Sequence, residues 1–239
     1  MKKSHLINFL ILLLLYLGLS SFPFSYFVNN EIWLKVFQIG VQIIFSIFAF
    51  IYIKKETEFT FCKHSGNKII FIPCFLACGS NFLYLAFASN DINPAFTSVI
   101  IPQIILYVFV AINEELIFRA IFISNSNYKT KLTTIIVSAA VFGVCHLTNF
   151  LSTFNPASLL MVVYTFLLGL MLGCIYVFTG SYIFVVSLHF AFNLLNDVLF
   201  EALVPNVTNI WFYLLSNTIV TLFVAVYLVI IYLKKKGEK

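Results

Sequence analysis

The sequence predicts an all-α protein, a polytopic bundle of transmembrane helices, and two observations carry this prediction. The first is composition: 62% of the 239 residues are hydrophobic, only 10% are charged, and the mean hydropathy is +1.02. A soluble globular domain has roughly a quarter charged residues, so this chain lacks the polar side chains that would cover its surface in water. The second is that the apolar residues form long runs separated by short polar breaks.

About eight of these runs are long enough to cross the hydrocarbon core, which takes roughly 20 residues of helix. They lie near residues 6–27, 32–53, 69–89, 97–122, 133–150, 158–179, 182–204 and 210–233. The first run follows Lys2 and Lys3 and could be read as a signal peptide. Its length and the lack of a small-x-small cleavage site favour a transmembrane helix.

The chain is expected to form a single membrane domain over residues 1–239, because no change in composition marks a boundary. Within it we distinguish N-terminal spans (6–89), a core that holds the chemistry (about 97–204) and a C-terminal span (210–233). Gly169 and Gly173 form a small-x-x-x-small pair in the sixth span, and such a pair allows close packing of helices.

Basic residues predict the orientation of the bundle, since they concentrate on the cytoplasmic side of a membrane. With eight spans and both termini in the cytoplasm, Lys35 is the only one of the 14 basic residues that falls outside. The net charge of +5 is therefore interpreted as an orientation signal, and we expect no nucleic-acid partner.

Several ionisable residues interrupt the apolar runs, and such residues usually face a polar interior and mark function. In the fourth span, Glu115 and Arg119 lie four residues apart and can pair on one helical face. Glu114 points away from that pair, which leaves its carboxylate available as a general base. The alternative is that all of these residues make structural hydrogen bonds between helices.

Two further spans carry polar groups of the same kind. His146 lies in the fifth span, and the seventh span carries His189, Asn193 and Asp197 at intervals of four, which forms one polar stripe. Asn193 could donate to an oxyanion or hold the His189 ring. At a rise of 1.5 Å per residue, the predicted spans place Glu114 and His189 roughly 10–12 Å from the cytoplasmic boundary and His146 roughly 20 Å from it. His146 would lie less deep if the fifth helix begins inside the cytoplasm, near Tyr128 to Leu132.

The absence of several sequence patterns disfavours three common types of intramembrane protease. The sequence contains neither the H-E-x-x-H pattern of a zinc helix nor the G-x-S-x-G pattern of a serine nucleophile, and its two aspartates do not suggest an aspartyl dyad. One glutamate, two histidines and one asparagine on three spans suit activation of a water against a carbonyl, with or without a metal.

Three motifs in this order resemble those of the CPBP intramembrane proteases, a family that includes type II CAAX prenyl endopeptidases, Abi proteins and bacteriocin-immunity proteins. The motifs are Glu114-Glu115-x-x-x-Arg119, Phe142-x-x-x-His146 and His189-x-x-x-Asn193. The resemblance covers about residues 113–197, and the first three spans carry none of it.

The resemblance implies an intramembrane endopeptidase that cleaves a hydrophobic peptide or membrane-associated protein. Glu114 and His146 would activate the water, and His189 and Asn193 would stabilise the oxyanion, with Glu115 and Arg119 in support. If a metal takes part, Glu114, His146 and His189 could bind zinc or another divalent ion.

Two alternatives stay open at this point. The protein could be a non-catalytic immunity or scaffold protein, or a proton-coupled transporter, although no inverted repeat favours transport. The short loops suggest a multi-pass protein of a bacterial plasma membrane.

Overall fold

A computed structural model describes residues 3–56, 72–80, 98–124, 131–199 and 210–237. Within these ranges the regular structure is helical and contains no strand, which confirms the all-α prediction. The helices are α1 (Lys3–Ser20), η1 (Phe24–Tyr26), α2 (Glu31–Glu56), α3 (Ile72–Cys78), α6 (Ile100–Glu115), η3 (Leu116–Ile123), α7 (Lys131–Cys145), α8 (Leu147–Thr153), α9 (Ala157–Thr179), α10 (Tyr182–Asn193), η5 (Leu194–Val198) and α12 (Ile210–Gly237). Of these, η1 is a 3₁₀ turn, and η3 and η5 are π-helical.

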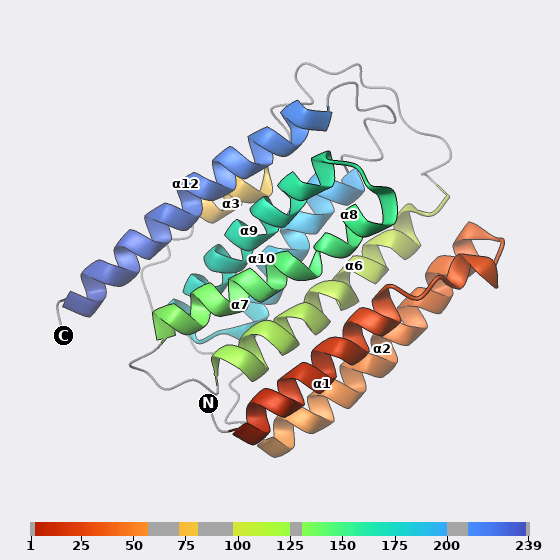
Figure 1. Ribbon diagram of the computed structural model, residues 1–239, viewed down its shortest axis with the longest axis horizontal. Helices are drawn as coiled ribbons and strands as arrows, with labels where there is room; N and C mark the ends of the chain where they lie inside the picture. The colour runs from red at the N-terminus through yellow and green to blue at the C-terminus, as the bar shows by residue number, and fades with distance from the viewer. Residues whose placement is uncertain (1–2, 57–71, 81–97, 125–130, 200–209, 238–239) are drawn as a thin grey trace.

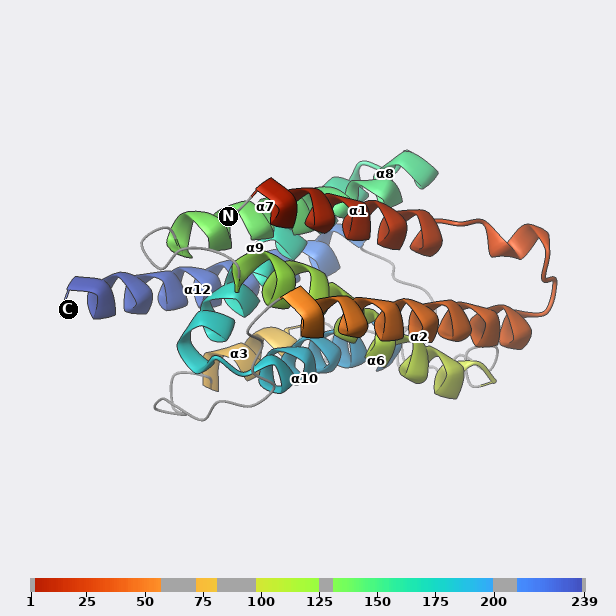
Figure 2. The same cartoon turned by 90° about the horizontal axis from the view of Figure 1, so that it is seen from below.

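The long helices lie side by side along one direction and form a single bundle (Figure 1). The α1–α2 hairpin forms one side of the bundle and α12 the other, with α6, α7, α9 and α10 between them (Figures 1 and 2). The first turn of α1 and the last turn of α12 lie at the same end of the bundle. The number of crossings and the cytoplasmic position of the termini stay predictions.

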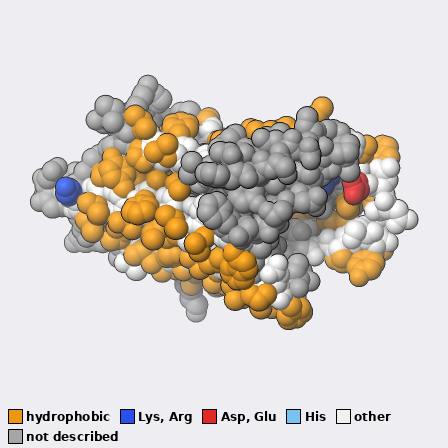
Figure 3. Space-filling view, turned by 90° about the horizontal axis from the view of Figure 1, so that it is seen from above, with side chains coloured by type: hydrophobic (Ala, Val, Ile, Leu, Met, Phe, Trp, Pro, Cys, Tyr) orange, Lys and Arg blue, Asp and Glu red, His pale blue; other side chains and the backbone are white. Residues whose placement is uncertain are grey.

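The outer surface suits a lipid environment. Among the described residues, four helical stretches are long and apolar enough to cross a membrane, namely Leu6–Tyr26, Glu31–Lys54, Ser158–Thr179 and Leu214–Lys234. Two shorter apolar stretches are Lys131–Cys145 and Tyr182–Val198. Large hydrophobic side chains on α1, α2 and α12 are exposed, such as Leu14, Ile44 and Phe223. Figure 3 shows hydrophobic side chains over much of the described part of one face, with charged ones visible only toward its two ends. These features fit a multi-pass membrane protein.

Helices α7 and α9 approach each other closely because small residues lie at their contact. A Cβ added to Gly169 would lie 3.0 Å from the Cα of Ala139, and one added to Gly173 would lie 2.9 Å from Cγ2 of Ile135. On the facing helix, a Cβ added to Gly143 would lie 2.9 Å from the carbonyl oxygen of Val162. The prediction that Gly169 and Gly173 serve helix packing is therefore confirmed.

The observed helix ends agree with the predicted spans in some places and differ in others. The sixth span, predicted at 158–179, corresponds to α9 at Ala157–Thr179. The fifth span, predicted as one helix over 133–150, breaks at His146, where the backbone N–H bonds to the Gly143 carbonyl in a tighter three-residue turn. The third span is described only over 72–80, and residues 200–204 of the seventh span also lie outside the described residues.

Candidate active site

All three sequence motifs lie where a regular α-helix is interrupted. Glu114 and Glu115 end α6, directly before the π-helical η3. His146 lies in the break between α7 and α8, and Asn193 ends α10 directly before the π-helical η5. Short π segments inside helices occur frequently at functional sites. The helix geometry therefore singles out the same three places as the motifs.

Glu115 and Arg119 form the predicted ion pair, and both side chains are buried. Nε of Arg119 lies 3.0 Å from Oε2 of Glu115. The guanidinium also donates from Nη2 to the Gly169 carbonyl at 3.2 Å and lies over the ring of Phe142, 5.2 Å from its centroid. A buried charge needs such compensation, so this pair joins η3 to α7 and α9.

His189 lies between the two glutamates. Its Nδ1 is 2.8 Å from Oε1 of Glu115, and its Nε2 is 3.5 Å from Oε2 of Glu114. The residue that holds the His189 ring is thus Glu115, a role that the sequence offered to Asn193. The side chain of Asn193 makes no hydrogen bond within the described part of the chain, and it remains available to a ligand.

The orientation of His146 is set by its own helix. Nδ1 lies 2.9 Å from the carbonyl oxygen of Phe142, which can only accept, so Nδ1 carries a proton. In the neutral ring, Nε2 is then the unprotonated nitrogen. The Phe142 ring packs edge-to-face against both His146 and His189, at centroid distances of 4.9 and 5.8 Å.

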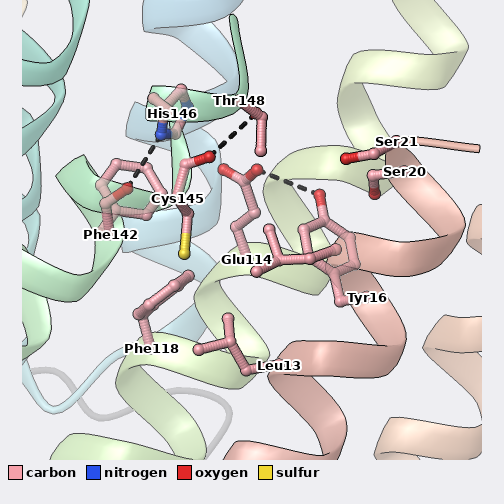
Figure 4. A pocket seen from close by; sticks show the side chains of 11 residues that line it. Leu13, Tyr16, Ser20, Ser21, Glu114, Phe118, Phe142, Cys145, His146 and Thr148 are labelled. Atoms are coloured by element: carbon pink, nitrogen blue, oxygen red, sulfur yellow. Dashed lines mark hydrogen bonds between the residues drawn. The ribbon is translucent and has the colours of Figure 1, made fainter. Parts of the chain in front are cut away.

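Four of the predicted site residues line one cavity of about 190 Å³, namely Glu114, His146, His189 and Asn193. Asp197 also lines it. A second cavity, of about 320 Å³, reaches Glu114 and His146 from the side of α1. In Figure 4 the Glu114 carboxylate lies between the end of α7 and Tyr16. Both cavities therefore give access to Glu114.

The N-terminal helices contribute polar contacts that the sequence motifs do not include. The Tyr16 hydroxyl donates to Oε1 of Glu114 at 3.0 Å (Figure 4). The neighbouring Asn113 donates to Oε1 of Gln42 at 2.6 Å and accepts from the Ser46 hydroxyl at 2.6 Å. Gln42 and Ser46 lie four residues apart within an apolar run, so the spacing that identified the stripe of His189 could also have identified them.

A metal site of three protein ligands is not assembled in this geometry. Among the described residues, no three His, Cys, Asp or Glu side chains are grouped closely enough to hold a metal ion. His189 instead directs its two ring nitrogens to the two glutamates. The His₂Glu ligand set, which the sequence suggests only if a metal takes part, is therefore not grouped for metal binding among the described side chains.

Comparison with known proteins gives a family match for the segment that carries the three motifs. Residues 96–195 match the family model described as type II CAAX prenyl endopeptidase, Rce1-like. No curated protein and no solved structure matches the chain. The matched segment contains Glu114, Glu115, Arg119, His146, His189 and Asn193. Over residues 96–195 the chain is therefore similar to the Rce1-like type II CAAX prenyl endopeptidases.

Proposed function

We propose that this protein is an intramembrane endopeptidase that cleaves a hydrophobic peptide or a membrane-associated protein with a water activated by Glu114 and His146. The observation that supports this proposal best is that Glu114, His146, His189 and Asn193 line one cavity although they come from three separate helical segments. A general base and an oxyanion donor must reach the same carbonyl, and a shared cavity provides that proximity.

In the proposed reaction, a water oxygen attacks the carbonyl carbon of the scissile peptide bond. The proton of the water passes to the Glu114 carboxylate or to Nε2 of His146. The C–N bond then breaks, and the same proton is transferred to the departing amine. The hydrogen bond from Tyr16 to Oε1 and the contact of His189 with Oε2 orient the Glu114 carboxylate for this step.

His189 and Asn193 would stabilise the negative charge that develops on the carbonyl oxygen. His189 bonds through Nδ1 to Glu115, so Nε2 can donate only if the ring carries both protons. In that form the positive charges of His189 and Arg119 balance the negative charges of Glu114 and Glu115. The amide of Asn193 supplies a second donor, and preorganised donors of this kind lower the barrier most in a site that excludes water.

The decisive experiment replaces Glu114 by Gln in purified protein reconstituted into nanodiscs, with the amount of inserted protein measured. Glutamine keeps the shape of the side chain and an acceptor for Tyr16, so we expect normal insertion and loss of peptide cleavage. Cleavage that survives in the Glu114→Gln variant would exclude this mechanism and favour an immunity or scaffold protein. Proton flux into proteoliposomes that depends on Glu114 would favour a transporter.

The proposal also includes a substrate class and a membrane. A signal-like peptide, a bacteriocin precursor or a quorum peptide in a bacterial plasma membrane is the substrate class that we favour. Comparison of membrane peptides from cells that contain the native protein or the Glu114→Gln variant would identify the substrate as the peptide that accumulates only in the variant.

A further inference from the structure

A third cavity, of about 360 Å³, lies between α1, α2 and α6 and also reaches Glu114. On α6 its wall is formed by Gln103, Leu106, Tyr107, Val110 and Glu114, and each of these lies three or four residues from another. This spacing places them on one face of the helix. The cavity is therefore a groove that runs along α6 and has Glu114 at one end.

The α2 wall of this groove is polar for most of its length. Lys35, Gln38 and Gln42 all line it. Gln42 lies at the Glu114 end, where its amide donates to Ser20 and accepts from Asn113. Farther from Glu114, two side-chain amide oxygens of the groove have no such partner in the described part of the chain.

Two amide oxygens in the groove are buried without a hydrogen-bond partner among the described residues, namely Oε1 of Gln38 and Oε1 of Gln103. The Gln103 residue as a whole is only 8% exposed. Buried acceptors in folded proteins are almost always paired, because leaving one unpaired is destabilising. Two unpaired acceptors in one groove indicate a ligand that brings hydrogen-bond donors.

We infer that this groove binds the backbone of the peptide substrate in an extended conformation, with the side-chain amides of Gln38 and Gln103 accepting hydrogen bonds from backbone N–H groups. This inference rests on the proposed function, since it assigns one side of the scissile bond to the groove. Gln103 and Glu114 are 11 positions apart on the helix, which corresponds to a rise of roughly 16 Å. An extended peptide rises about 3.3 Å per residue, so the groove holds about five residues.

Recognition through the backbone has a consequence for specificity. Hydrogen bonds to peptide N–H groups do not depend on the substrate side chains, so the groove would accept hydrophobic segments of varied sequence. It requires, however, that the segment leave its helical conformation, because a helix uses its own N–H groups. The substrate class is therefore a hydrophobic peptide that can be extended over about five residues next to the cleaved bond.

The test measures binding separately from cleavage. Fluorescently labelled hydrophobic decapeptides are titrated against the Glu114→Gln protein in nanodiscs, and each peptide is also made with single backbone amides replaced by esters, which removes one N–H donor at a time. We expect one ester position to weaken binding roughly tenfold. Adding Gln103→Leu should weaken binding of the all-amide peptide by a similar factor and abolish the effect of that ester. The matched control is Thr221→Val, which removes a buried hydroxyl that also lacks a described partner but lines none of the three cavities.

The outcomes separate this inference from the proposed function. Two results would refute peptide binding in the groove. The first is that the Gln103→Leu and parent proteins bind every peptide with equal affinity, and the second is that neither protein binds any peptide. Peptides that bind through Gln103 but are not cleaved by the native protein would leave the groove intact and refute the peptidase. Because the Gln103 oxygen has no described partner to lose, the variant should fold, and its melting temperature checks this.

Discussion

The hydroxyl of Tyr16 donates a hydrogen bond to Oε1 of Glu114, a residue 98 positions later in the chain. Tyr16 is almost completely buried in α1, outside the segment 96–195 that matches the Rce1-like family. The first helix therefore takes part in the candidate site, and it does so through the carboxylate to which we assign the activation of water.

Replacing Tyr16 by Phe should lower kcat about tenfold to a hundredfold while changing KM little. The variant removes one hydrogen bond to a carboxylate, an interaction worth roughly 1.5–3 kcal/mol at most, and leaves the packing of the ring against Phe45 in place. Steady-state cleavage of a peptide by reconstituted protein measures both constants. Tyr26→Phe is the control, because Tyr26 is exposed in η1 and should tolerate the change. An unchanged kcat in Tyr16→Phe would mean that Glu114 is positioned without this contact.

Removal of the charge of Glu115 should destabilise the fold far more than removal of the charge of Glu114. Glu115 is fully buried and compensates both Arg119 and His189, and breaking a buried pair by deleting one partner costs roughly 3–5 kcal/mol. We expect Glu115→Ala to lower the melting temperature and the amount of inserted protein. Glu114→Gln, which stays hydrogen-bonded to Tyr16, should melt close to the native protein. Equal stability of the two variants would contradict the structural role of Glu115.

Gly169→Ala should destabilise the bundle and disturb the site at the same time. The added methyl group would lie 3.0 Å from the Cα of Ala139 and 3.2 Å from Cδ1 of Phe142, and overpacking of this kind typically costs 1–3 kcal/mol. The carbonyl of Gly169 also accepts from Arg119, so a shift of α9 moves the acceptor of that charge. Thermal unfolding of the reconstituted protein measures the effect. Gly18→Ala serves as the control, because an added Cβ at Gly18 meets no atom within 4 Å.

Chelation of divalent metals should leave peptide cleavage unchanged. The described residues offer no group of three His, Cys, Asp or Glu side chains that could hold a metal ion, and the proposed mechanism uses none. The measurement compares cleavage before and after treatment with 1,10-phenanthroline, together with the zinc content of the native and His146→Ala proteins. Activity that is lost on chelation and restored by added zinc would require side chains to rearrange into a ligand set.

Those parts of the site that depend on spacing along one helix could be predicted from the sequence. Glu115 and Arg119 pair as their separation of four residues predicts, and Gly169 and Gly173 pack against α7 as their pattern predicts. Neither result needs information from another helix, because side chains four residues apart share a helical face.

Contacts between helices could not be derived in the same way. A tyrosine such as Tyr16 within an apolar run carries no periodic signal, and its contact with Glu114 follows from how α1 packs on the bundle. The depth estimate likewise placed His146 roughly 8–10 Å deeper than Glu114, yet both line the same cavity. The described part of α7 begins at Lys131, inside the range suggested for an early start of the fifth helix.

Asn193 and Asn196 provide a paired test of the oxyanion role, since they lie three residues apart at the end of α10 and in η5 but differ in their contacts. Asn196 is buried, donates to the carbonyl of Cys78 at 3.0 Å and accepts from the Ser80 hydroxyl at 3.4 Å, so Asn196→Ala should lower the melting temperature and the yield of inserted protein. Asn193 lines the cavity of Glu114 and makes no hydrogen bond within the described chain, so Asn193→Ala should insert and melt normally.

If Asn193 donates to the oxyanion, its removal should slow turnover by about two to three orders of magnitude, because the interaction forms mainly in the transition state. Single-turnover cleavage at saturating peptide measures this loss without a contribution from binding. A structural role would produce the opposite pattern, in which Asn193→Ala fails to accumulate while the surviving protein cleaves at the native rate. The two variants therefore separate a donor that acts on the substrate from one that holds the helices together.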